Sequence, residues 1–178
     1  ALATGTIEFD GDVNLSVGRS LVLDAARTTG TGDVNLAAPY IAIGNTDTAY
    51  QQTPTPVSAD SGTFQVSGNF VELLGHSTID DFDAVKLNSD GDLRLRGVLL
   101  TGQQTITGGL NTSADLTLRA DQVYGSTLSD FTLAVQGDPD RVLRVESTGG
   151  TRATVLSAGS HLTLRAPTIE QAGVLRAP

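Results

Sequence analysis

The chain of 178 residues contains no cysteine, no methionine and no tryptophan. Without cysteine, neither a disulfide framework nor a thiolate metal site can form. No apolar run is long enough for a membrane-spanning helix, and no signal peptide is recognisable. Because methionine is absent, we expect the chain to be a processed protein or an excised slice of a longer one.

Basic charge and aromatic residues are also scarce. The formal net charge is −9, from 11 basic and 20 acidic residues, and only Lys86 is a lysine. Arginines alternate with leucines and do not cluster on a basic face with aromatic residues, which make up 4% of the chain. These features argue against a nucleic acid as a partner.

The sequence does contain a repeat. The pentapeptide GDVNL occurs at 11–15 and again at 32–36, and its relatives are GTFQV at 62–66, GDLRL at 91–95, ADLTL at 114–118 and SHLTL at 160–164. The last step is long enough to hold one degenerate copy, which we expect near Val142–Val145. Self-similarity of this kind is typical of solenoids, in which each unit buries its apolar face against its neighbours.

Within each copy, apolar and polar residues alternate, which is the spacing of a β-strand. A second apolar position follows five or six residues after the last leucine, with Pro39 and Pro167 at the corner between the two. No stretch of ten or more residues has helical spacing. The sequence therefore predicts an all-β parallel β-helix with coils of about 20–23 residues.

The expected core is one interior column that runs through a single domain, residues 1–178. Its inward residues are predicted to be Val13, Leu15, Val34, Leu36, Leu93, Leu95, Leu116, Leu118, Leu162 and Leu164. The polar segment Asn45–Asp60 should leave the column as a loop, because it offers nothing to bury. Within it, Tyr50, Gln51 and Gln52 are the best candidate contact residues, although an inert loop is the simpler interpretation.

Acidic residues are the first candidates for chemistry. Asp80, Asp81 and Asp83 form the densest cluster, and such carboxylates bind calcium or act as acid and base in β-helical polysaccharide lyases and hydrolases. A solvated loop is nevertheless the favoured interpretation of this cluster. A second set recurs one residue before a strand and is interpreted as turn residues: Asp12, Asp33, Asp92 and Asp115.

Histidines and arginines offer little more. His76 and His161 lack a serine and an acid at a supporting spacing, so both are expected to be surface residues. The arginines at outward positions could contact a sulfated or sialylated glycan, or pair with neighbouring acids: Arg94, Arg96, Arg119 and Arg165. We therefore predict no catalytic, cofactor-binding or metal-binding residue.

Three segments carry a family resemblance: GNFVELLGHSTIDDF, LNSDGDLRLRGV and SAGSHLTLRAPTIEQAGVLRAP. They resemble repeats of the filamentous haemagglutinin family of large exoproteins, which Gram-negative bacteria secrete by the two-partner route. The resemblance is strongest from Gly62 onward. It implies a right-handed parallel β-helix, export through an outer-membrane transporter partner, and a secreted or cell-surface location. An NPNG-type secretion signature is missing, so the resemblance is to the shaft of such proteins.

The expected function is that of a structural, non-enzymatic shaft segment of a virulence-associated adhesin or exoprotein, serving adhesion or the display of a distal domain such as a toxin. Two alternatives stay open. One is a carbohydrate-active β-helix enzyme, and the other is a module that binds a host glycan or receptor through the loop at 45–60. No cofactor is expected, and the chain itself should be a monomer or a weak end-to-end associate.

Overall fold

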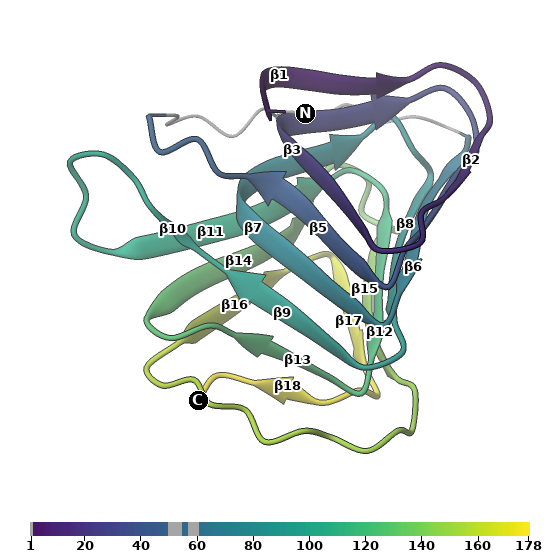
Figure 1. Cartoon of the computed structure of the whole chain (residues 1–178). Coiled ribbons are helices and arrows are strands. Elements are labelled where there is room, and N and C mark those ends of the chain that lie inside the picture. The colour runs from purple at the N-terminus through teal and green to yellow at the C-terminus, as the bar shows by residue number, and fades with distance from the viewer. Residues whose placement is uncertain (1, 50–54, 57–60) are drawn as a thin grey trace.

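The computed structural model describes residues 2–49, 55–56 and 61–178. In these ranges all regular secondary-structure elements are β-strands, and no helix is present (Figure 1). The strands form two sheets, of seven and eleven strands, and paired strands run parallel except β10 and β11. The described part of the chain holds no helix with the length and hydropathy that a membrane crossing requires. The predicted all-β class is confirmed.

The seven-stranded sheet is built from strands spaced along the whole chain. They are β2 (Val13–Ser16), β4 (Val34–Ala37), β6 (Thr63–Gly68), β8 (Ala84–Ser89), β12 (Asp115–Ala120), β15 (Val142–Ser147) and β17 (Thr168–Gln171). Each strand pairs with the next one in sequence order, from β2 at one edge to β17 at the other. Equivalent residues of successive strands therefore lie beside one another in long rows.

The eleven-stranded sheet is branched. Its main path consists of β1 (Leu2–Phe9), β3 (Ser20–Gly30), β5 (Tyr40–Asn45), β7 (Phe70–Asp80), β11 (Ile106–Thr112), β14 (Ser129–Val135) and β16 (His161–Arg165). The branch consists of β9 (Asp92–Arg96), β13 (Gln122–Gly125) and β18 (Leu175–Arg176), while β10 (Val98–Leu99) pairs with β11.

The branch point is β7, whose first half pairs with β9 and whose second half pairs with β11. Gly75 lies between the two halves with a φ of 55°. A Cβ atom at this position would lie 2.0 Å from the carbonyl oxygen of Asn45 on β5. Glycine is thus required both by the backbone conformation and by the close approach of the neighbouring strand.

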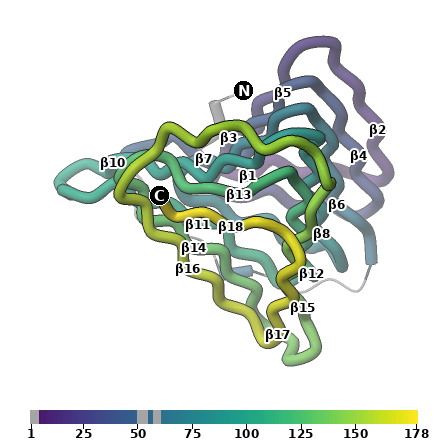
Figure 2. The backbone as a smooth tube through the Cα atoms, turned by 90° about the horizontal axis from the view of Figure 1, so that it is seen from below, coloured from purple at the N-terminus to yellow at the C-terminus, as the bar shows by residue number. Residues whose placement is uncertain are grey.

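The chain alternates between the two sheets. We call the stretch from one strand of the seven-stranded sheet to the next a circuit. Figure 2 shows successive circuits following similar outlines from the purple end of the chain to the yellow end. Parallel pairing between consecutive circuits is compatible with the predicted β-helix.

Two rows of apolar side chains cross the inner face of the seven-stranded sheet. One row is Val13, Val34, Phe64, Val85, Leu116, Leu143 and Ile169, and the other is Leu15, Leu36, Val66, Leu87, Leu118 and Val145, followed on β17 by the polar Gln171. The five interior members of each row are at most 2% exposed. Burying each side chain of this size stabilises the fold by roughly 1.5–3 kcal/mol, so stacking between circuits accounts for much of the core.

The ten residues expected in the core do not share one environment. Six are at most 2% exposed: Val34, Leu36, Leu93, Leu95, Leu116 and Leu118. Val13, Leu162 and Leu164 are partly buried against the same core. Leu15 differs from the prediction, because it is 42% exposed. It lies on β2, the edge strand of the seven-stranded sheet in the part of the chain that the structure describes.

The repeat copies divide between the two sheets, although their buried apolar side chains belong to one core cluster. GDLRL forms β9 and SHLTL forms β16, both in the eleven-stranded sheet, whereas the other copies lie in the seven-stranded sheet. The degenerate copy predicted near Val142–Val145 is β15. Leucines alternate in the same way on both sheets, so the local pattern could not distinguish them.

The polar segment Asn45–Asp60 begins in the sheet, because Asn45 is the last residue of β5 and is buried. Thr46 donates hydrogen bonds to Asp24 through its backbone N–H and its hydroxyl group. Across the circuit that contains the segment, β3 pairs directly with β7 at Arg27–Thr29. The predicted contact residues Tyr50, Gln51 and Gln52 lie outside the described residues.

Candidate functional site

The acidic cluster predicted from the sequence is divided between two arginines. Asp80 Oδ1 lies 2.9 Å from Arg27 Nε, and Asp81 Oδ2 lies 3.6 Å from Arg27 Nη2. Asp83 instead accepts from Arg141 Nη1 at 2.7 Å. The prediction of a solvated loop was wrong for Asp80, which belongs to β7 and whose side chain is fully buried. Among the described residues, no three His, Cys, Asp or Glu side chains are grouped to hold a metal ion.

The recurring aspartates tie neighbouring circuits together. Their Oδ1 atoms accept from backbone N–H groups, at 2.8 or 2.9 Å, in the pairs Asp12 with Asp33, Asp33 with Thr63, and Asp115 with Val142. Asp92 makes the equivalent link to the side-chain Nε2 of Gln122, at 3.1 Å. Gln122 lies directly opposite Asp92 on the paired strand, and the other three donors each come just before the first paired residues of two neighbouring strands. These carboxylates are therefore structural.

The two histidines lie apart from each other. His76 on β7 is half-buried, its Nε2 lies 2.9 Å from Thr107 Oγ1, and burial lowers its pKa. His161 is exposed at the start of β16. A neutral, hydroxyl-bonded His76 serves to link β7 to β11.

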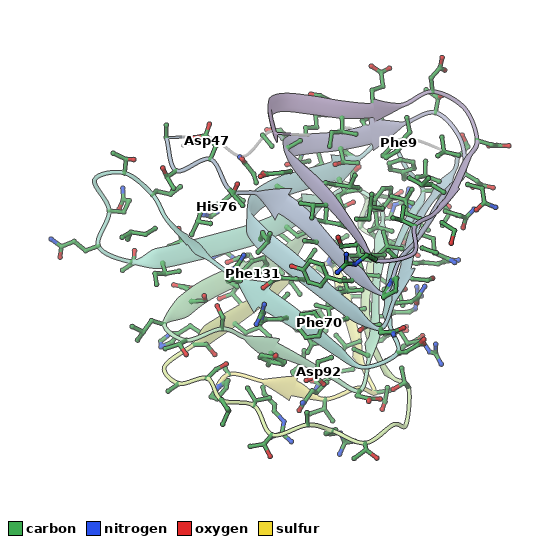
Figure 3. The ribbon with its side chains drawn as sticks, viewed as in Figure 1. Phe9, Asp47, Phe70, His76, Asp92 and Phe131 are labelled. Atoms are coloured by element: carbon green, nitrogen blue, oxygen red, sulfur yellow. The ribbon has the colours of Figure 1, made fainter. Side chains whose placement is uncertain are left out.

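A different group of side chains gathers on the outer face of the eleven-stranded sheet. We call it the β5–β13 patch, and it consists of Tyr40, Phe70, Glu72, Arg94, Arg96 and Tyr124. The four strands that carry it are neighbours, in the order β5, β7, β9 and β13. The residues that follow Tyr40, Phe70 and Glu72 are core residues, so strand alternation directs the patch outward. Figure 3 shows Phe70 above Asp92, where the paired strands β7 and β9 begin.

Glu72 is the centre of the patch and is only 1% exposed. Its Oε1 atom accepts from Arg94 Nε at 2.6 Å and lies 3.3 Å from Arg96 Nε. Its Oε2 atom accepts from the hydroxyl group of Tyr40 at 2.6 Å. Three donors from two neighbouring strands thus compensate for the burial of one carboxylate.

Two rings of the patch, Tyr40 and Phe70, stack on each other, and the guanidinium group of Arg94 lies over Phe70. The Phe70 and Tyr40 rings stack with centroids 6.1 Å apart and planes inclined by 14°. Arg94 Cζ lies 5.2 Å from the Phe70 centroid, within the range of a cation–π contact. The patch therefore combines stacked aromatic rings with the guanidinium group of Arg94.

The two phenol groups of the patch do not titrate near neutral pH. Burial, the hydrogen bond to Glu72 and the charge of Glu72 together raise the pKa of Tyr40 to about 12. Burial also raises the pKa of Tyr124. Both phenols are protonated at neutral pH, and the Glu72 carboxylate is covered by its three donors. The patch is suited to binding rather than to acid–base catalysis.

The aromatic residues of the chain support a binding interpretation. Among the described residues, four phenylalanines contribute to the core: Phe9, Phe64, Phe82 and Phe131. The other described aromatic residues, Tyr40, Phe70 and Tyr124, all belong to the patch. Sequence reasoning found Arg94 and Arg96 as outward residues but missed Tyr40, Phe70 and Glu72. The usable signal was the single acid between Val71 and Leu73 in an otherwise apolar strand.

A scan against protein-family models, a search of curated proteins and a search of solved structures each found no match to this chain. Function is therefore inferred from the strand topology and from the β5–β13 patch.

Proposed function

We propose that the chain is a right-handed parallel β-helix that serves as a stiff shaft segment of a secreted or cell-surface exoprotein. The observation that carries this proposal is the pair of apolar rows in register across one sheet, one over all seven strands and the other over the six strands from β2 to β15. In such a shaft, each circuit is held by its neighbours through backbone ladders and core stacking. Its role is to set the distance between the cell and a distal adhesive or toxic domain.

The polar groups support a structural role as well. Asp33 and Asp115 are bonded to backbone N–H groups of the next strand, and Asp80 is buried against Arg27. Catalytic carboxylates instead need access to a substrate. The best-defined carboxylate on the outer face, Glu72, is enclosed by donors.

Cell location gives the test of this proposal. Antibodies against the chain should label intact producing cells or precipitate the protein from the medium. Deletion of the outer-membrane transporter that the family resemblance implies should retain the protein inside the cell. A protein found only in the cytoplasm of wild-type cells would refute the shaft proposal, and a crystal structure would decide the handedness of the coil.

A second candidate function is the binding of a glycan or receptor at the β5–β13 patch. It is favoured by the concentration of the outward aromatic rings beside Arg94 and Arg96, because tyrosine and arginine dominate binding energies at interfaces. Phe70→Ala should abolish binding on a glycan array that the wild type recognises. Gln65→Ala, on the outer face of β6 in the other sheet, is the matched control. Equal glycan binding by the wild type and Phe70→Ala would show that the patch is not the binding site.

A further inference from the structure

A groove of about 250 Å³ follows the corner at which the chain passes from the seven-stranded sheet to the eleven-stranded sheet. The residues that line it come from four successive circuits, at 16–17, 37–39, 67–69 and 90. Because neighbouring strands lie about 4.8 Å apart, the three steps between these circuits make the groove about 14 Å long. Pockets that enclose a small molecule usually measure about 300–1,000 Å³, so this smaller, open groove is better suited to a segment of a chain molecule.

The groove and the β5–β13 patch lie side by side. Pro39, which lines the groove, directly precedes Tyr40. Asn69, which lines it one circuit later, directly precedes Phe70. The Tyr40 and Phe70 rings stack across the paired strands β5 and β7 with centroids 6.1 Å apart. The groove and the row of rings therefore cross the strands in the same direction.

Successive circuits present equivalent positions to the groove. Ser16 pairs with Ala37, and Ala37 pairs in turn with Ser67. A polymer whose repeat is close to the strand spacing thus meets corresponding groups at each circuit. Extended chains of linked pyranose units have a repeat of this kind.

Charge distinguishes an uncharged ligand from an anionic one. Among the described residues that line the groove, Asp90 alone is ionisable, and it is exposed. In the patch, the Nε atoms of Arg94 and Arg96 lie 2.6 and 3.3 Å from Glu72 Oε1, so this carboxylate compensates part of their charge. The chain has a net charge of −9, which repels polyanions. Uncharged sugar rings, by contrast, can pack on aromatic side chains and bond to a few polar groups.

We propose that the ligand of the β5–β13 patch is an unbranched, uncharged polysaccharide. It lies along the stacking direction, with sugar rings against Tyr40 and Phe70 and the neighbouring units in the groove. This inference rests on the second candidate function and names its ligand, and it is independent of export and of the shaft role. Because contacts recur from one circuit to the next, affinity increases with chain length until the groove is filled.

Binding of oligosaccharides of increasing length tests the ligand class. The probes are cello-, xylo- and N-acetylated chito-oligosaccharides from the disaccharide to the hexasaccharide, with heparin fragments of the same lengths as the anionic comparison. At least one uncharged series should bind about tenfold more tightly as the hexasaccharide than as the disaccharide. Its affinity should hardly change with ionic strength. No binding in any uncharged series, tighter binding of the heparin fragments, or an affinity independent of length would overturn the proposal.

Filling the groove tests its contribution directly. Ala37→Trp places a bulky side chain in the groove beside the rings, so it should keep disaccharide binding and lose the gain with length. Ser67→Trp fills the groove one circuit later and gives the answer if Ala37→Trp does not fold, which circular dichroism checks. Asn35→Trp, at an exposed position of β4 outside the groove, is the matched control and should bind like the wild type.

The variants also separate this inference from the function on which it rests. If Phe70→Ala binds every probe like the wild type, the β5–β13 patch is not a binding site and both proposals fail. If Phe70→Ala loses binding while folded Ala37→Trp and Ser67→Trp keep the gain with length, the patch stands and only the inference about the groove is overturned.

Discussion

The Oδ1 atom of Asp33 accepts a hydrogen bond from the backbone N–H of Thr63, 2.8 Å away in space and 30 residues further along the chain. The same link joins Asp12 to Asp33 and Asp115 to Val142. A side chain at the start of one strand thus fixes the start of the next. The register of the seven-stranded sheet is therefore set by polar links at its margin as well as by leucine and valine rows in its interior.

Replacing Asp33 by alanine should lower the free energy of unfolding by about 1 kcal/mol, because the N–H of Thr63 loses its acceptor. Asp33→Asn keeps an acceptor oxygen and should cost less. Asp130→Ala, at an exposed position on β14, is the control and should change little. Urea denaturation measures all three. If Asp33→Ala and Asp130→Ala were equally stable, the aspartate link would have no energetic role.

Leu95→Asp and Leu15→Asp form a matched pair. Leu95 is fully buried, so an aspartate there loses the roughly 1.5–3 kcal/mol of a buried leucine and also buries a charge. We expect Leu95→Asp to yield no soluble folded protein, whereas Leu15→Asp at the edge should fold. Soluble yield and circular dichroism distinguish them. A soluble Leu95→Asp with unchanged melting would contradict the inward position of Leu95.

The phenol of Tyr40 gives a pH-dependent test. Its pKa is raised from 10.0 to about 12 in the folded protein, chiefly by burial and then by Glu72. The folded state therefore holds this proton more tightly than the unfolded state, and the associated stability is complete below pH 10 and lost as pH rises toward 12. The urea midpoint should fall across this window in the wild type, and fall less in Tyr40→Phe.

Glu72→Gln tests the cause of that shift by ultraviolet titration of tyrosinate. Removing the charge should lower the pKa of Tyr40, while burial should keep it above 10.0. The pKa of Tyr40 should not fall in Asp92→Asn, which removes the charge of a carboxylate on the neighbouring strand β9. An unaltered Tyr40 titration in Glu72→Gln would mean that burial alone raises the pKa.

Shortening the chain within Asp47–Pro56 should be tolerated. The reason is that β3 pairs directly with β7, so the sheet is continuous without a strand from this segment. Thr46→Val, by contrast, removes the hydroxyl hydrogen bond to the buried Asp24 and should destabilise by about 1 kcal/mol. Thermal melting compares the two. A shortened chain less stable than Thr46→Val would assign the segment a role in folding.

Alternation along single strands predicted much of the fold. Leu116 and Leu118 point inward as expected, and corners do lie at Pro39, between β4 and β5, and at Pro167, between β16 and β17. Local alternation could not assign GDLRL to the correct sheet, since leucines alternate on both. It also could not show that Leu15 lies at an edge, because exposure there depends on what is stacked above it.

The candidate site was harder to predict for a related reason. Tyr40 and Glu72 are 32 residues apart, and Glu72 and Arg94 are 22 apart. Their contact depends on pairing between circuits of unequal length, which a single sequence does not specify. Arg94 could be placed outward from its leucine neighbours, but its partner acid and the ring beneath it required the register. The family resemblance remains a prediction.

The direct pairing of β3 with β7 has a consequence for how such a protein changes over time. Because those two strands pair directly, exchange of a cassette within Asp47–Pro56 should leave the periodicity of the scaffold unaltered. Gain, loss or exchange of such a cassette needs no compensating substitution in the stacked leucines and valines. The scaffold can stay constant while this segment diversifies.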